Sequence, residues 1–251
     1  MAKRAVALKE DEGQVPAHLR QYQSGRGLSK DQSDNVVPII RILQALSPQV
    51  QKRNNEYIDG AEQGDLLLRN AADPIVKGEE GIFFQPCYFR KDWVEWVPRE
   101  SGGGMAGRYP ALPATAQRVE DEKGRNVQKY VQPNGNELKE TRYHFGFVLG
   151  HGAPMPFVIP MSGSGHSISK ALMTLLNMKG GDLDSFVHVL KLKTRPTSNA
   201  LGEWFTWDIA WDRYATEEEC KEGEKLYDAL AKGQKVAEDL DQEDEIHSSR
   251  I

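Results

Sequence analysis

The sequence has few of the features that mark secreted, membrane-spanning or metal-binding proteins. Its 251 residues include only two cysteines, Cys87 and Cys220, which leaves no disulfide framework and no zinc spacing. No run of about 18 apolar residues occurs, and the first stretch, MAKRAVALKEDEG, has no apolar core long enough for a signal peptide. These absences predict a soluble protein of a reducing cytoplasm, with neither a membrane nor a cofactor among its partners.

Catalytic motifs are also lacking. The turn GSGHS at 163–167 stands between a predicted strand and a predicted helix, but it has neither the Lys-Ser/Thr ending of a P-loop nor the spacing of a nucleophile elbow. A hydrolase built on Ser164 and His166 would have no identifiable acid partner. The six histidines show no pairing at i, i+4 that would indicate a metal site. The sequence therefore predicts a protein that is not an enzyme and holds no metal.

Acidic charge is concentrated at one end of the chain. The formal net charge is −5, yet residues 36–214 carry 21 basic and 20 acidic side chains, whereas residues 215–251 carry 5 basic and 12 acidic ones. Six of those acids fall within EDLDQEDE at 238–245, and such a block of like charges is typical of a disordered interaction tail. The body of the protein is close to neutral and can still present one basic face.

The periodicity of the sequence defines one domain between two polar extensions. Residues 1–35 show no sustained period and are predicted to be a flexible arm. Residues 36–214 form the predicted domain, within which 99–141, with SGGGMAG and three prolines, are a long insertion. Residues 215–251 are predicted to form a helix that begins with a capping box at Thr216 and Glu219, followed by the acidic tail.

Strand and helix patterns follow one another in the order of an OB-fold. Strands are predicted at 81–89, 93–98 and, with a break, 143–161, then a helix at 167–178, then strands at 185–193 and 203–212. Arg90, Lys91 and Asp92 separate the first two strands, which predicts a hairpin. The fold class predicted is therefore mainly β, an OB-like β-barrel in the order β-β-β-α-β-β, with one helix between strands, a long insertion and a C-terminal helix.

Alternation in the second half predicts which side chains point outward. Tyr143, Phe145 and Phe147 share one face, which leaves Arg142 on the other. In the predicted strand 185–193, Lys191 and Lys193 lie on the face opposite Leu190 and Leu192. In the predicted strand 203–212, Trp204 lies on the face opposite the bulky aromatic residues. The apolar positions predicted to be buried are Ile168, Leu172, Leu175 and Leu176 of the helix, Leu190 and Leu192, and Phe205, Trp207, Ile209 and Trp211. Ser167 or Ser169 is predicted to cap the helix.

Aromatic and basic residues are interleaved between Tyr88 and Tyr109. Single-stranded nucleic acid requires this combination, because flat side chains stack unpaired bases while Arg and Lys contact the phosphates. Core packing is the competing explanation for any one of the aromatic residues, since most of those in a small barrel fill its interior. The candidate nucleic-acid-binding residues are Tyr88, Arg90, Lys91, Trp93, Trp96, Arg99, Arg108, Tyr109, Arg142, Lys191, Lys193 and Trp204.

Four segments carry a resemblance to a known family: DNVVPIIRILQALSPQV at 34–50, FFQPCYFRKDWVEWVPRESGGGMAGR at 83–108, PFVIPMSGSGHSISKALMTLLNMK at 156–179 and GEWFTWDIAW at 202–211. Together they resemble phage-encoded single-stranded DNA-binding proteins of OB-fold type, from replication and recombination gene sets. The resemblance implies a protein that coats exposed single strands in the cytoplasm of a host cell. A phage virion or assembly protein is the alternative, since a β-rich body with polar arms also suits that role.

The acidic segment resembles the tails by which single-strand binders recruit replication and recombination proteins. It departs from them in one respect: such tails commonly end in Phe directly after the acids, whereas His247–Ile251 follow here. Recruitment of partners through this tail is therefore left open, as is assembly into a homo-oligomer. The tail is also predicted to compete with DNA for the basic face, because a linked polyanion acts at high effective concentration.

Overall fold

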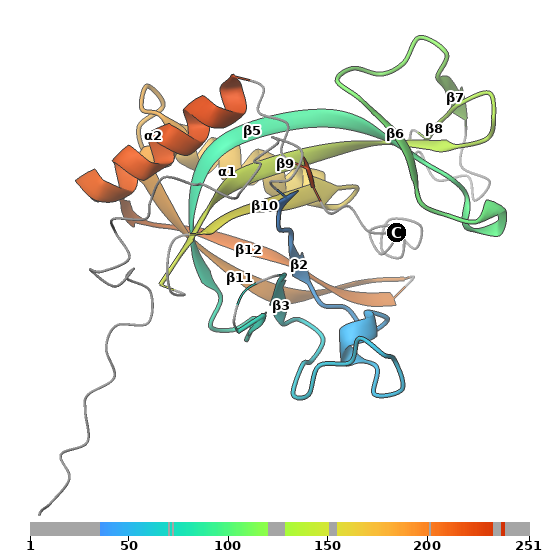
Figure 1. Cartoon of the computed structure of the whole chain (residues 1–251), viewed down its shortest axis with the longest axis horizontal. Helices are drawn as coiled ribbons and strands as arrows, with labels where there is room; N and C mark the ends of the chain where they lie inside the picture. The colour runs from blue at the N-terminus through green and yellow to red at the C-terminus, as the bar shows by residue number, and fades with distance from the viewer. Residues whose placement is uncertain are drawn as a thin grey trace, which may run out of the picture.

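The computed structural model describes residues 36–69, 71, 73–119, 129–150, 155–200, 202–232 and 237–238. Its main feature is an eight-stranded antiparallel sheet (Figure 1). The five long strands lie side by side in the order β10 (Met155–Ser162), β9 (Glu137–Leu149), β5 (Ile82–Trp96), β11 (His188–Asn199) and β12 (Gly202–Tyr214). The mainly β class predicted from the alternation is confirmed.

Smaller elements surround this sheet. Three short strands widen the sheet at the C-terminal end of β5 and the N-terminal end of β9: β6 (Met105–Tyr109), β7 (Gln117–Val119) and β8 (Lys129–Val131). A second sheet contains β2 (Ile40–Ile42), β3 (Leu66–Leu68) and β4 (Ile75–Val76), and a third pairs β1 (Val36–Val37) with β13 (Ala237–Glu238). The helices are α1 (Gly165–Met178) and α2 (Glu217–Ala231), with 3-10 turns η3 (Pro48–Val50), η4 (Arg99–Ser101) and η5 (Ser185–Val187).

The predicted barrel is not closed. In the described part of the chain no ladder joins β10 to β12, the two strands whose pairing would complete it. Residues 38–44, which include β2, lie along the free edges of both strands instead. The backbone N–H of Val158 in β10 donates to the Pro38 carbonyl at 3.0 Å, and the Gln44 side chain donates to the Phe205 carbonyl in β12. A segment from outside the five-strand pattern therefore occupies the gap.

The predicted hairpin at Arg90–Asp92 is wrong, because β5 runs without a break from Ile82 to Trp96. The polar residues at this point indicated a turn, but ion pairs allow them to lie within a continuous strand. Asp92 is only 4% exposed, and its Oδ2 lies 2.7 Å from the Arg90 Nε and 3.8 Å from the Arg108 Nε. A buried carboxylate is tolerated inside a sheet when it is paired in this way.

The described residues of the segment 99–141 extend the sheet. β6 pairs with β5, β8 pairs with β9, and β9 itself begins at Glu137, upstream of the predicted start of that strand. β5 and β9 consequently form a long curved ribbon that projects from the body of the molecule towards β6, β7 and β8 (Figure 1). The ribbon is the platform of the candidate site.

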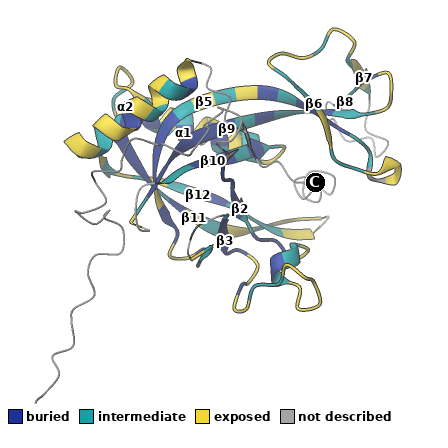
Figure 2. Ribbon diagram, in the orientation of Figure 1, coloured by how far each residue is buried: buried dark blue, intermediate teal, exposed yellow. Residues whose placement is uncertain are grey.

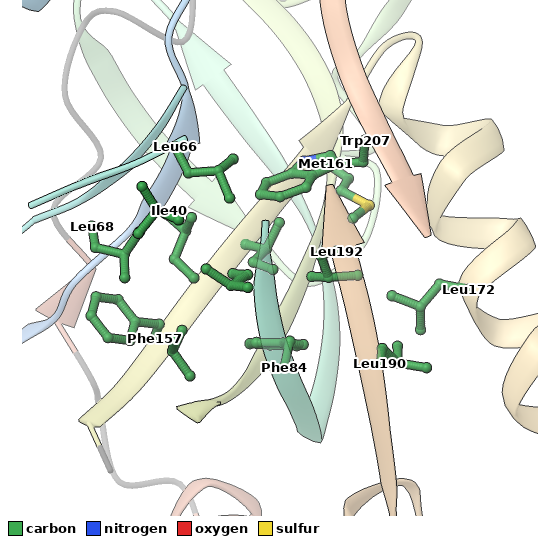
Figure 3. Close-up of a cluster of buried hydrophobic side chains, with 14 of the residues drawn as sticks. Ile40, Leu66, Leu68, Phe84, Phe157, Met161, Leu172, Leu190, Leu192 and Trp207 are labelled. Atoms are coloured by element: carbon green, nitrogen blue, oxygen red, sulfur yellow. The ribbon is translucent and has the colours of Figure 1, made fainter. Parts of the chain in front are cut away.

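The core lies where the main sheet, the β2–β3–β4 sheet and α1 meet. Figure 3 shows its side chains converging from β2, β3, β5, β10, α1, β11 and β12: Ile40, Leu66, Leu68, Phe84, Phe157, Met161, Leu172, Leu190, Leu192 and Trp207. The predicted apolar stripe of α1 is confirmed, with Leu172 and Leu176 buried and Ile168 and Leu175 packed against them. Figure 2 shows that burial is densest in the middle of the main sheet.

Both helices begin close to the predicted residues. α2 has the predicted capping box, in which Glu219 N–H donates to Thr216 Oγ1 and Thr216 N–H donates to the Glu219 carboxylate. For α1 the predicted cap at Ser167 or Ser169 is wrong, because the helix starts earlier, with Ser164 at the N-cap position. Within the described residues, neither helix is long and apolar enough to cross a membrane.

Candidate nucleic-acid interface

A β-bulge at Cys87 decides which residues of β5 share a face. The pairing register between β5 and β9 shifts between Pro86 and Tyr88, so Cys87 is an extra residue and the alternation changes phase there. Before the bulge, Gln85 faces α2, and its amide donates to the Glu219 carbonyl at 2.9 Å. After the bulge, Tyr88 faces α2, with its ring 6.1 Å from the ring of Tyr227. We call this side the α2 face.

The opposite side of the ribbon carries a row of alternating aromatic and basic residues. Phe89, Lys91 and Trp93 follow one another at every second position of β5, so their side chains share a face. Arg142 stands directly opposite Lys91 on β9. We call this surface, Phe89, Lys91, Trp93 and Arg142, the Lys91 face. Phe89 is 37% exposed and Lys91 is exposed, so both can reach a ligand.

The two cations of the Lys91 face differ in their surroundings, because Lys91 is exposed whereas Arg142 is paired with a carboxylate. Arg142 Nε lies 2.9 Å from Glu140 Oε1, and both side chains are mostly buried. Two like charges directly opposite each other on neighbouring strands are unfavourable, by a few tenths to about 1 kcal/mol. A bound anion at Lys91 would remove that repulsion, and phosphate oxygens fit both side chains.

Around Trp93 the row widens into an aromatic cluster. The Trp93 ring meets the Tyr130 ring edge-on, with centroids 5.2 Å apart, and Tyr109 lies opposite Trp93 on β6. The Tyr109 hydroxyl donates to Glu95 at 2.6 Å, which lowers the pKa of the Glu95 carboxyl and raises the pKa of the tyrosine. Asn136 donates to the same carboxylate at 2.6 Å. These bonds hold Tyr109 in place beside Trp93.

Four other candidates lie on the α2 face. Trp96 is 5% exposed and belongs to the core, and Tyr88 packs between Phe145 and Tyr227, so neither ring is open to a base. Arg90 and Arg108 share the Asp92 carboxylate, and both guanidinium groups lie over the buried Tyr143 ring, at 5.3 and 5.2 Å. These four residues form a supporting layer beneath the Lys91 face. Arg99 begins η4, and its side chain lies outside the described part of the structure.

The remaining candidates, Lys191, Lys193 and Trp204, are separated from the Lys91 face by the sheet. Lys191 is opposite Phe83 on β5, and Phe83 shares the side of Gln85 and thus of α2. The Lys191 Nζ lies 4.0 Å from the Phe83 ring centroid, and burial lowers its pKa. Lys193 stands opposite Asp208. The structure therefore divides the twelve candidates and brings Lys91, Trp93, Tyr109 and Arg142 together.

Two residues of this region were not among the candidates: Phe89, which lies in the interleaved segment, and Tyr130, which packs beside Trp93. The alternation of Phe89, Lys91 and Trp93 would have identified Phe89 if β5 had been read as one strand. Tyr130 reaches Trp93 because β8 pairs with β9, where Tyr130 stands opposite Leu138. No local sequence pattern predicts this pairing. His144, beside Phe89 with ring centroids 5.1 Å apart, was likewise not predicted.

The two histidines next to the Lys91 face have structural partners. His144 is 2% exposed, and its Nε2 lies 2.9 Å from the Ser169 Oγ of α1. Burial and, to a smaller extent, the charge of Arg142 together lower the pKa of His144 to about 4, so the ring is neutral at pH 7. His166 Nε2 contacts the Glu140 carbonyl oxygen at 2.8 Å. Within the described residues no group of three or more His, Cys, Asp or Glu side chains is placed to hold a metal ion.

Comparison with known proteins places the chain among phage proteins. A family model described as Pam3 phage gp34-like protein matches residues 9–236. The chain therefore belongs to the Pam3 phage gp34-like protein family, and the predicted phage origin is confirmed. No curated protein and no solved structure matches it.

Proposed function

We propose that the protein binds single-stranded DNA on the Lys91 face and coats exposed strands during phage replication or recombination. The observation that carries the proposal is the Phe89–Lys91–Trp93 row with Arg142 opposite Lys91. Two rings that flank a cation along one strand provide stacking positions for bases with a phosphate contact between them. Residues two apart on a strand are about 6.8 Å apart, so the row runs along the ribbon, as an extended DNA strand would.

The arrangement of strands is consistent with this proposal. The order β10-β9-β5-β11-β12, with α1 between β10 and β11, agrees with an OB-like barrel left open between β10 and β12. OB-folds place oligonucleotides on an exposed sheet face. In this proposal the face lies on the projecting part of the ribbon, where α1 does not cover Lys91.

Fluorescence anisotropy with a labelled single-stranded oligonucleotide, and with a duplex of the same sequence, tests the proposal. We expect tighter binding to the single strand, and an affinity that falls as salt rises, with a slope in log–log form of about −0.7 for each phosphate contacted. Equal affinity for the duplex, or binding that does not depend on salt, would contradict it. Absence of binding would leave the virion or assembly role as the better explanation of the fold.

A further inference from the structure

An exposed apolar patch lies at the end of α1 away from the Lys91 face. Met178, the last residue of α1, is 78% exposed, Leu183 in the following turn is 53% exposed and Tyr214 is 52% exposed. The Tyr214 hydroxyl donates to the Lys179 carbonyl at 2.8 Å, and the Leu183 N–H donates to the Gly180 carbonyl at 2.9 Å. These bonds place Tyr214 and the turn that carries Leu183 beside the C-terminal end of α1, where Met178 lies. We call Met178, Leu183 and Tyr214 the Leu183 patch.

Internal contacts fix the patch in shape. The Trp211 ring meets the Tyr214 ring edge-on, with centroids 5.1 Å apart, and the Lys179 Nζ lies 4.7 Å from the Trp211 centroid. Exposed apolar side chains that gather in one place, especially with a polar rim, mark interaction sites. The Leu183 patch is such a group of side chains.

The rim of the patch is acidic. Asp182 and Asp184 flank Leu183 and are exposed, as is Glu218 in the first turn of α2. That turn lies close by, because the Ala215 N–H donates to the Val187 carbonyl at 2.8 Å and the Val187 N–H donates to the Asp184 carbonyl at 3.1 Å. Lys179, the cation next to Met178, is placed over Trp211. An apolar centre with a rim of carboxylates fits a partner segment that has apolar side chains between basic ones.

This chain contains such a segment at residues 3–9, Lys-Arg-Ala-Val-Ala-Leu-Lys. Its three cations match the three carboxylates of the rim, and Val6 and Leu8 supply apolar side chains between them. Twenty-six residues separate Lys9 from Val36, where β1 begins. Fully extended, they span at most about 90 Å, which is enough to reach a neighbouring molecule.

We propose that the Leu183 patch binds residues 3–9 of a second copy of this chain. β1, to which the segment is tethered, packs in the same cluster as Leu230, at the end of α2 remote from Glu218 and the patch. A contact between unlike surfaces of successive copies repeats head to tail and builds a ring if it closes or an open chain if it does not. α1 contains 14 residues, so about 21 Å of helix separates the patch from the Lys91 face, which stays open to DNA in every copy.

Self-association of the full-length chain without DNA tests this proposal separately from DNA binding. In sedimentation equilibrium at low salt, the weight-average mass should rise with concentration towards at least twice the mass of one chain. It should return to that of one chain at about 0.5 M salt, where screening extends over only a few ångströms. A chain that stays monomeric at every concentration would overturn the proposal, whatever its affinity for DNA.

Substitutions identify the two surfaces. Met178→Ser with Leu183→Ser should abolish association, whereas Met105→Ser with Leu112→Ser, at residues that are 43% and 37% exposed elsewhere, should not. Lys3→Glu, Arg4→Glu and Lys9→Glu together should also abolish association, and adding Asp182→Lys and Asp184→Lys to that variant should restore it. Association that survives loss of the patch would overturn the assignment.

Mixing the two deficient variants distinguishes exchange between copies from binding within one copy. The patch variant retains residues 3–9 and the charge-reversed variant retains the patch, so each alone should be monomeric and an equal mixture should form a one-to-one dimer. A mixture that remains monomeric, although the native chain associates, would contradict binding of the segment of one copy to the patch of another.

Discussion

Lys91 and Arg142 stand directly opposite each other on β5 and β9, two cations on the same side of the ribbon. Arg142 has Glu140 at 2.9 Å, whereas Lys91 is exposed beside it. Like charges in this position cost stability. The same arrangement favours binding of a DNA backbone, since a phosphate placed beside Lys91 neutralises its charge and relieves the repulsion.

The first prediction is that Lys91→Thr improves stability and impairs DNA binding. Removing the repulsion should raise the free energy of unfolding by about 0.2–1 kcal/mol, measured by urea denaturation, and should lower the salt slope of single-strand binding by about 0.7. Lys193→Thr is the matched control, because Lys193 faces Asp208 and its loss should leave binding unchanged. A Lys91→Thr protein that is less stable and binds normally would contradict the role assigned to this lysine.

Trp93 and Trp96 should respond in opposite ways to replacement by Ala. Trp93 lies on the Lys91 face, so its loss should cost one stacked base, about 1–3 kcal/mol of binding free energy, with an intact circular dichroism spectrum. Trp96 is in the core, so its loss should lower the free energy of unfolding by about 3–5 kcal/mol. Unfolding of the Trp93→Ala protein would show that this ring, too, supports the core.

His144 makes the stability of the fold depend on pH. The unfolded chain binds a proton at His144 with a pKa near 6.5, whereas burial lowers the folded pKa to about 4. Stabilisation from the neutral ring is therefore present above pH 6.5 and is lost as the pH falls towards 4, by up to about 3 kcal/mol. Urea denaturation should show that the pH dependence in this range is smaller in His144→Gln than in the native chain. An identical dependence in both would contradict this account.

The Gln44 side chain makes the hydrogen bonds with the backbone of β12 that a neighbouring strand would otherwise make. Its side-chain amide donates to the Phe205 carbonyl and accepts from the Phe205 N–H, both at 2.8 Å. Gln44→Ala should lower the free energy of unfolding by about 1–3 kcal/mol, because a half-buried backbone pair loses both partners. Gln51→Ala, at an exposed glutamine bonded to Leu46, is the control and should change it little. Equal effects of the two substitutions would remove the special role of Gln44.

The sequence was sufficient to predict the mainly β class, the buried stripe of α1 and the capping box of α2, because each depends on local spacing. It was insufficient for the long strands, because it divided β5 into two strands and counted β9 and β10 as one interrupted strand. It was insufficient at Asp92, because the polar run Arg90–Asp92 indicated a turn, whereas Arg90 of the same strand and Arg108 of β6 both pair with this carboxylate inside the sheet. It was insufficient again at the edges of β10 and β12, where residues 38–44 occupy the gap of the expected barrel. These features depend on contacts between distant segments, which no local pattern carries.

The candidate site was predictable in composition but not in arrangement. Aromatic and basic residues were expected around 88–109, and the bulge at Cys87 decides which of them share a face. That single extra residue places Arg90 against Tyr143 and leaves Lys91 exposed. A one-residue shift of register exchanges the two faces of a strand, and the sequence alone does not locate it.

The most direct measurement compares the two faces of the sheet in one binding assay. Phe89 and Phe83 are both 37% exposed and lie on opposite faces of β5, so Phe89→Ala with Lys91→Thr can be matched by Phe83→Ala with Lys193→Thr. The account predicts that the first pair weakens binding to a single-stranded oligonucleotide by at least about 30-fold, from one stacked ring and one phosphate contact, while the second pair changes it less than about threefold. Equal losses in the two variants, or a larger loss in the second, would contradict the assignment of the Lys91 face as the DNA-binding surface.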